Sequence, residues 1–381
     1  MNEEYRLPNT EVRMGCDPRL LHFAFRIPNS LLHMTESQAN ESASWRQHWT
    51  WAKWLLAAAL LTFVLWRHRA GLSQITHQPL HWPSFVTAVA LCGGAIVLTF
   101  LRWFYLVKAL GFVFTIRDAL RLGFIGYLFN FVAPGSVGGD VVKATLLAKE
   151  QPSRRTTAVA TVLLDRILGM LSLFLIGAWA AWAQWTEIRD RAELKAIVGL
   201  LVIGSAAGLV GLSLMLIPAV TRSRAWQHLA RLPVVGHMVA ELVEGVRLYQ
   251  SQRRVLFVAL GISIVGHFGT ISSFYFSAKA ISGESFVPGY AQHLFFIPAA
   301  ELAGIVPLTP GGVGLLEEAV NALYKLNGAA DGTGILTCLA YRAVTLAIAL
   351  IGMGYYLTAR REIDQALHAE PIAENALITP T

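Results

Sequence analysis

The sequence N-F-V-A-P-G-S-V-G-G-D-V-V-K, residues 130–143, interrupts a strongly apolar region with glycines, a proline and one acid. A shorter counterpart, P-L-T-P-G-G-V-G-L-L-E, occupies residues 307–317 and is also flanked by apolar sequence. Glycine permits unusual backbone angles and proline ends helices. Both stretches therefore predict a break between two short helical arms.

The two stretches are related by a constant offset. Pro134 and Pro310 lie 176 positions apart, and the same offset separates Arg166 from Arg342. Each arginine lies within an apolar run. A shared offset of this kind predicts an internal duplication of the chain.

Composition places the chain in the membrane. Of its 381 residues 55% are hydrophobic and 14% are charged, against about 25% charged in soluble domains. The apolar stretches are long and continuous, which predicts an all-α, polytopic membrane helix bundle. The net charge of +7 comes from basic residues between apolar segments, as in loops that face anionic lipid, and does not indicate nucleic acid. The cysteines show no metal or redox spacing, so we expect no disulfide framework, metal or other cofactor.

The apolar runs predict six spanning helices and two hairpins. The expected spans are 50–66, 84–107, 156–183, 196–217, 255–281 and 333–358. The arms around the glycine motifs, 118–131, 139–149, 290–306 and 312–325, are shorter than the roughly 20 residues that a span needs. We therefore expect two re-entrant, broken helical hairpins.

The same pattern divides the chain into regions. Residues 1–47 form a polar tail, expected to be disordered, in which translation is expected to start at Met34. Residues 48–360 form the membrane domain, and 361–381 a second polar tail. The repeat halves are about 84–183 and 255–358, linked by the span 196–217 and by an amphipathic surface helix in 222–254.

Basic loops predict the topology. Their distribution favours a multi-pass protein of the inner membrane with both termini in the cytoplasm. Three spans separate the two hairpins, so the hairpins are expected to enter from opposite faces as an inverted repeat. Inverted repeats with broken helices are typical of alternating-access carriers.

The glycines of each motif leave two interpretations open. Gly135, Gly138, Gly139, Gly311, Gly312 and Gly314 can expose backbone N–H groups at the start of a half-helix, which favours an anion such as phosphate. Alternatively, they only permit close packing of helices.

The charges within the predicted spans leave a similar choice. Asp165 and Arg166 lie roughly 14 Å into their helix, near the bilayer centre. Buried charges there require partners. For Arg166 these are Asp140 or Asp165, and for Arg342 they are Glu317 or Glu301. The arginines then either lock the bundle as ion pairs or bind a lipid phosphate, which the planar guanidinium suits.

Three further polar residues flank these groups. Lys143 is expected either to touch ligand or to extend to the cytoplasmic face. Arg102 lies near the end of its span, where it can extend to the membrane surface. His267 is expected to be a hydrogen-bonded packing residue.

At these residues the chain resembles a known family, the transmembrane region of lysylphosphatidylglycerol synthases and its stand-alone, flippase-like relatives. The family pattern N-x-x-x-P-x-x-x-G-G-D-x-x-K/R is matched by Asn130, Pro134, Gly138, Gly139, Asp140 and Lys143. Its D-R motif is matched by Asp165 and Arg166, and its P-x-T-P-G-G-x-G-x-x-E motif by Pro307, Thr309, Pro310, Gly311, Gly312, Gly314 and Glu317. In full-length synthases a separate soluble domain transfers lysine, and this chain ends at Thr381, soon after its last predicted span. The resemblance thus implies only the lipid-translocating half and no aminoacyltransferase activity.

The expected function is a lipid translocase rather than an enzyme. Its partner is a membrane lipid, either an anionic phospholipid or a polyprenyl-phosphate-linked lipid, with an envelope-lipid enzyme as a further partner. The residues expected to contact the lipid are Asn130, Pro134, Gly135, Gly138, Gly139, Asp140, Lys143, Asp165, Arg166, Glu301, Thr309, Pro310, Gly311, Gly312, Gly314, Glu317 and Arg342. Two alternatives stay open: an intramembrane lipid-linked transferase with Asp140 or Glu317 as base, and a non-catalytic accessory subunit.

Overall fold

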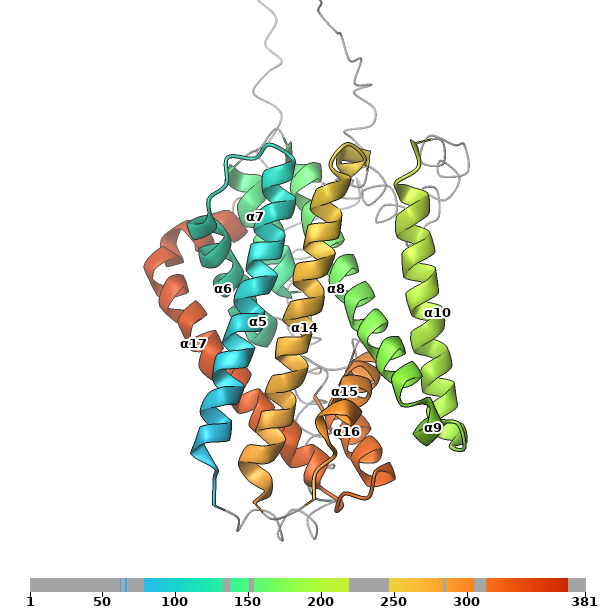
Figure 1. The fold of residues 1–381 in the computed structure, drawn as a ribbon. Coiled ribbons are helices and arrows are strands. Elements are labelled where there is room, and N and C mark those ends of the chain that lie inside the picture. Colours follow the sequence, from blue (N-terminus) through green and yellow to red (C-terminus); the bar gives the residue numbers. More distant parts are fainter. Residues whose placement is uncertain are drawn as a thin grey trace, which may run out of the picture. The chain divides into compact units, whose positions relative to one another are not determined.

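The computed structural model describes residues 79–132, 138–150, 154–218, 247–283, 286–304 and 313–368, together with Thr62 and Trp66. Within these residues every regular element is helical (Figure 1). The elements are α5 (Trp82–Ala109), α6 (Ile116–Val132), α7 (Gly138–Glu150), α8 (Arg155–Ala183), α9 (Trp185–Ile188), α10 (Ala192–Met215), α14 (Arg253–Ser282), α15 (Tyr290–Gly304), α16 (Leu315–Leu326) and α17 (Thr333–His368). The all-α prediction is confirmed.

Five described helices are long and apolar enough to cross a membrane. They comprise Trp82–Ala109, Thr157–Ala183, Ala192–Leu214, Arg253–Ser282 and Thr333–Thr358. Five of the six predicted spans are thus confirmed as helices of spanning length. The first predicted span, 50–66, lies outside the described residues except for Thr62 and Trp66, as do the tail 1–47 and most of the amphipathic segment.

The last helix is longer than predicted. α17 continues to His368, ten positions beyond the predicted end at residue 358. The sequence R-R-E-I-D-Q-A-L-H over residues 360–368 is rich in good helix formers and holds no Gly or Pro, so the helix continues after its apolar run has ended.

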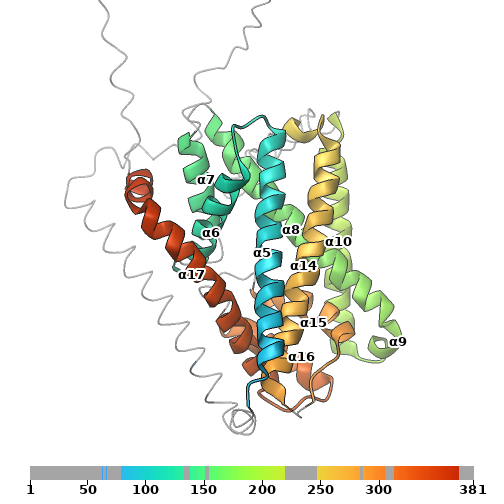
Figure 2. The same cartoon turned by 60° about the vertical axis from the view of Figure 1, so that its left-hand side comes forward.

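α5 and α14 lie side by side and run in opposite directions (Figures 1 and 2). The backbone N–H of His81 donates to the carbonyl of Ala280 at 2.8 Å. Further along, the Ser273 hydroxyl donates to the carbonyl of Ala88 at 2.8 Å. A Cβ on Gly269 would stand 3.2 Å from a side-chain atom of α5. Small residues thus let the two helices approach closely, as is common in membrane bundles.

Two short helical hairpins occupy opposite ends of the bundle. α6 packs on α7, and α15 packs on α16. α7 lies at the upper end in Figure 1 and α16 at the lower end. Three long apolar helices of the described part of the chain, α8, α10 and α14, lie between the hairpins in the sequence.

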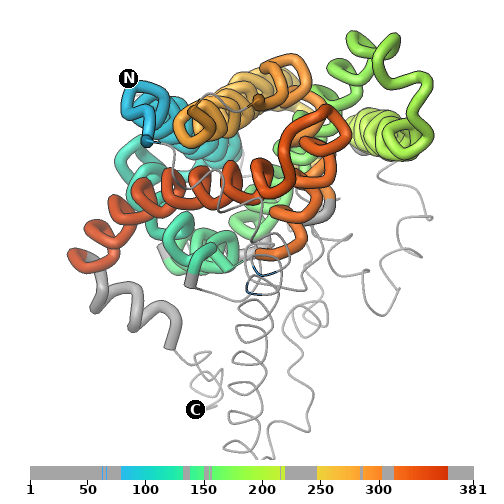
Figure 3. The backbone as a smooth tube through the Cα atoms, turned by 90° about the horizontal axis from the view of Figure 1, so that it is seen from below, coloured from blue at the N-terminus to red at the C-terminus, as the bar shows by residue number. Residues whose placement is uncertain are grey.

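Each hairpin packs against a long helix from the other half of the chain. Gly352 of α17 lies against α6, where an added Cβ would be 2.2 Å from the carbonyl oxygen of Phe124. Gly177 of α8 lies against α15, where an added Cβ would be 3.0 Å from Cβ of Pro298. Gly177 and Gly352 lie 175 positions apart, and Phe124 and Pro298 lie 174 apart. In Figure 3 the tube of α17 crosses the bundle, with α5 and α14 again adjacent.

Burial distinguishes the central helix from the peripheral one. In the most apolar stretch of α8, 61% of the residues are buried, whereas in that of α10 only 11% are buried. α8 contacts α5, α7, α10, α14 and α15. It therefore holds its charged residues at the centre of the bundle.

Candidate functional site

The first charged cluster joins the start of α7 to the middle of α8. Asp140 forms an ion pair with Lys143, in which Nζ lies 2.9 Å from Oδ1. Its other oxygen, Oδ2, accepts a hydrogen bond from Nε of Arg166. The Asp140 and Lys143 side chains are 11% and 9% exposed, whereas that of Arg166 is 37% exposed. The cluster holds one carboxylate and two cations, and its most exposed member is the Arg166 side chain.

Close contact between the arms holds this cluster in place. The backbone N–H of Gly139 donates to Oδ1 of Asn130 at 3.0 Å. A Cβ on Gly139 would lie 2.0 Å from the carbonyl oxygen of Gly126. Gly139 therefore serves the close approach of α6 and α7, and its N–H is already satisfied by the side chain of Asn130.

The second charged pair joins the start of α16 to α17. Nε of Arg342 donates to Oε1 of Glu317. The other carboxylate oxygen of Glu317 accepts the backbone N–H of Gly314 at 2.7 Å, capping α16. Gly314 has a φ of +91°, a backbone angle that favours glycine. The Glu317 side chain is fully buried and that of Arg342 is 26% exposed.

The two pairs occupy corresponding places. In each half an acid near the start of the second arm bonds an arginine of the following long helix. Arg166 and Arg342 are 176 positions apart, and Asp140 and Glu317 are 177 apart. The predicted partners Asp140 for Arg166 and Glu317 for Arg342 are confirmed.

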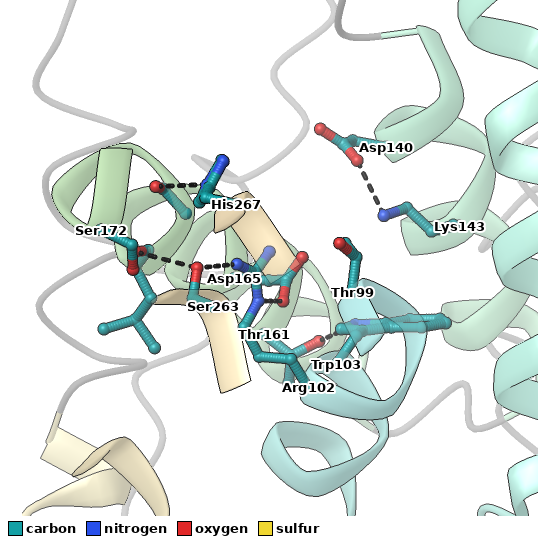
Figure 4. A network of polar contacts seen from close by, with 12 residues as sticks. Thr99, Arg102, Trp103, Asp140, Lys143, Thr161, Asp165, Ser172, Ser263 and His267 are labelled. Carbon is teal, nitrogen blue, oxygen red and sulfur yellow. Dashed lines mark hydrogen bonds and ion pairs between the residues drawn. The ribbon is translucent and has the colours of Figure 1, made fainter. Parts of the chain in front are cut away.

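Asp165 does not pair with Arg166, and that alternative is wrong. Oδ1 of Asp165 instead accepts a hydrogen bond from Nε of Arg102 at 2.6 Å, and the side chains of Asp165 and Arg102 are 4% and 6% exposed. Nη1 of Arg102 also donates to the Ser263 hydroxyl at 2.5 Å. Figure 4 shows this network between α5, α8 and α14. Arg102 is thus a buried partner of Asp165, so the expectation that it extends to the membrane surface is also wrong.

The structure bears on two more expectations about polar residues. Lys143 is buried against α5, with Nζ 5.4 Å from the centroid of the Trp103 ring. Its extension to the membrane surface is therefore wrong. His267 bonds the carbonyl of Gly169 through Nε2 at 3.0 Å, which confirms its packing role.

The remaining predicted residues lie partly outside the described structure. Glu301 lies half-buried in α15, and Glu317 rather than Glu301 pairs with Arg342. Gly138 begins α7. Pro134, Gly135, Thr309, Pro310, Gly311 and Gly312 lie outside the described residues. Among the described residues, no three His, Cys, Asp or Glu side chains gather in a group that could hold a metal ion.

Sequence reasoning missed two contributors to the site. Gly126 permits the contact with Gly139, and its only signal was a glycine within the first arm. Ser263 accepts a hydrogen bond from Arg102. A serine in an apolar helix only weakly indicates such a role.

One protein family matches the chain. The family described as lysylphosphatidylglycerol synthase TM region matches residues 44–352, which include every charged residue of both clusters. No curated protein matches the chain significantly.

Proposed function

The chain belongs to this family of membrane proteins, and we propose on that premise that it is a lipid translocase. It moves a phosphate-bearing lipid between the leaflets of the inner membrane by alternating access. The observation that carries the proposal is the repetition of a partly exposed arginine, bonded to a buried acid, in two hairpins at opposite ends of the bundle.

An inverted repeat accounts for this arrangement. The halves, α5 to α8 and α14 to α17, have the same order of long helix, two short arms and long helix. Their first helices run antiparallel, and the described residues between the hairpins hold an odd number of long helices. Carriers with inverted repeats place their substrate site between broken helices of this kind.

The arms are too short to span the membrane, which supports a re-entrant course. They contain 17, 13, 15 and 12 residues, or roughly 18–26 Å at 1.5 Å per residue. A bilayer core is roughly 30 Å thick. Each hairpin therefore reaches into the membrane and returns.

The arginines suit a lipid phosphate. An arginine in the membrane interior is costly and is usually paired or functional. Here the acids are the more buried partners, and the arginine side chains keep an exposed part. A guanidinium fork binds two phosphate oxygens at once. The lipid is then an anionic phospholipid or a polyprenyl-phosphate-linked lipid.

Reconstitution tests the proposal. Purified protein in liposomes that contain a fluorescent phosphatidylglycerol should speed the movement of this lipid between leaflets, measured by chemical quenching of the outer leaflet. Arg166→Gln and Arg342→Gln should each reduce the rate at least fivefold. Arg189→Gln is the matched control, because the Arg189 side chain is 60% exposed in a loop.

Two results would contradict the proposal. One is a rate no faster than that of empty liposomes, and the other is an unchanged rate in both arginine variants. Formation of a new lipid product from lipid and donor would favour the transferase alternative instead.

A further inference from the structure

Among the residues that the structure describes, the two charged clusters differ in the number of cations that pair with each acid. Asp140 has two, Lys143 at 2.9 Å and Arg166. Glu317 has Arg342 and the N–H of Gly314. Lys143 follows its acid by three positions, whereas the residue three positions after Glu317 is the fully buried Val320. The second half thus has no lysine at the corresponding place.

We propose that Arg166 is the group that exchanges its carboxylate for the lipid phosphate, and that Lys143 makes this exchange possible. Arg342 keeps its pair with Glu317 and supports the second hairpin. This inference rests on the proposed function and assigns unequal roles to its two arginines.

The two arginines differ in how well the carboxylate that each would leave is compensated. When Arg166 turns to a phosphate, Asp140 keeps its ion pair with Lys143. When Arg342 leaves, the partner that the fully buried Glu317 keeps among the described residues is one backbone N–H. An uncompensated buried charge is strongly destabilising, so only the first exchange is inexpensive.

Packing fits Lys143 to the role of the fixed partner. Its ammonium faces the Trp103 ring, and its stem packs so closely on α6 that a Cβ on Gly126 would stand 2.8 Å from its Cγ. Its side chain is 9% exposed, against 37% for Arg166. Arg166 is therefore the cation that a ligand reaches.

Binding measurements separate this inference from transport. Purified protein in detergent is titrated with phosphatidylglycerol, with diacylglycerol as the phosphate-free control, and the bound lipid is counted by native mass spectrometry. Arg166→Gln should weaken phosphatidylglycerol binding at least tenfold. Arg342→Gln should lower the unfolding temperature and change affinity by less than threefold.

The lysine is tested by a set of matched variants. Lys143→Met should weaken binding at least tenfold, because Arg166 is then the one cation that Asp140 keeps among the described residues. Lys143→Arg should bind within threefold of the wild type, and Lys143→Met combined with Asp140→Asn should return to that range. Should Lys143→Met fail to fold, Asp140→Asn alone decides. It should raise the affinity for phosphatidylglycerol at least threefold, because Arg166 then no longer has to give up its bond to a carboxylate at residue 140.

Three results would overturn the inference. They are equal weakening by Arg166→Gln and Arg342→Gln, weaker binding in Asp140→Asn, and wild-type protein that prefers phosphatidylglycerol no more than diacylglycerol. The expected binding pattern without transport in liposomes would refute the proposed function and leave the inference standing. If the protein transports lipid in liposomes but the variants bind phosphatidylglycerol as the wild type does, the inference alone is refuted.

Discussion

Removal of Arg102 should destabilise the bundle far more than removal of a surface charge. The Arg102–Asp165 pair is almost fully enclosed, with side chains 6% and 4% exposed. Loss of one partner from such a pair costs about 3–5 kcal/mol, because the other charge remains buried without compensation. At about 2 °C per kcal/mol for a chain of this size, Arg102→Met should lower the unfolding temperature by about 6–10 °C.

A double variant distinguishes a lost charge partner from lost packing. Arg102→Met combined with Asp165→Leu replaces both charges with apolar groups, and such replacements are often neutral or stabilising. The double variant should therefore recover most of the loss. Thermal unfolding of the purified protein in detergent, followed by size-exclusion chromatography, provides the measurement.

The matched control is an exposed ion pair in a loop. Arg189 and Asp190 approach at 3.7 Å with side chains 60% and 84% exposed, and such pairs contribute about 0–1 kcal/mol. Arg189→Met should shift the unfolding temperature by no more than about 2 °C. A loss in Arg102→Met as small as this, or a double variant less stable than Arg102→Met, would refute the argument.

Two further predictions concern packing and a buried hydrogen bond. Gly139→Ala should destabilise the protein by about 1–3 kcal/mol through overpacking, since the new Cβ would lie 2.0 Å from a carbonyl of α6; Gly94→Ala, with nothing within 4 Å, should match the wild type in thermal unfolding. His293→Phe removes the 2.6 Å hydrogen bond to the Tyr324 hydroxyl and should lower the free energy of unfolding by about 1–3 kcal/mol. If adding Tyr324→Phe restores none of this stability in a denaturation experiment, the loss of the hydrogen bond is not the cause.

The spanning helices could be predicted because each needs only a long apolar run. α5, α8, α10 and α14 begin and end within a few residues of the predicted bounds. α17 exceeded its prediction because helix propensity continued beyond the apolar run. Hydropathy reports where a helix enters lipid, and it contains no signal for where the same helix ends in water.

The partners of the arginines were predictable only in part. Charges in apolar helices need partners, which limited Arg166 to two acids. Geometry excludes Asp165, because successive helical residues diverge by about 100° and do not face each other. The pairing of Asp165 with Arg102 depends on which helices pack together, and no local pattern records that α5 lies against α8.

Exposure separates the charges that support the fold from the arginine that we propose to bind a lipid. Asp165 and Arg102 are enclosed by three helices and satisfied by each other and by Ser263. Arg166, the next residue along α8, is 37% exposed and bonds an acid that has a second cation. A ligand that reached Asp165 would have to displace the packing of α5 on α14, where small residues bring the helices into close contact. The neighbouring residues of the D-R motif therefore differ in surroundings, with the aspartate in the scaffold and the arginine in the proposed lipid site.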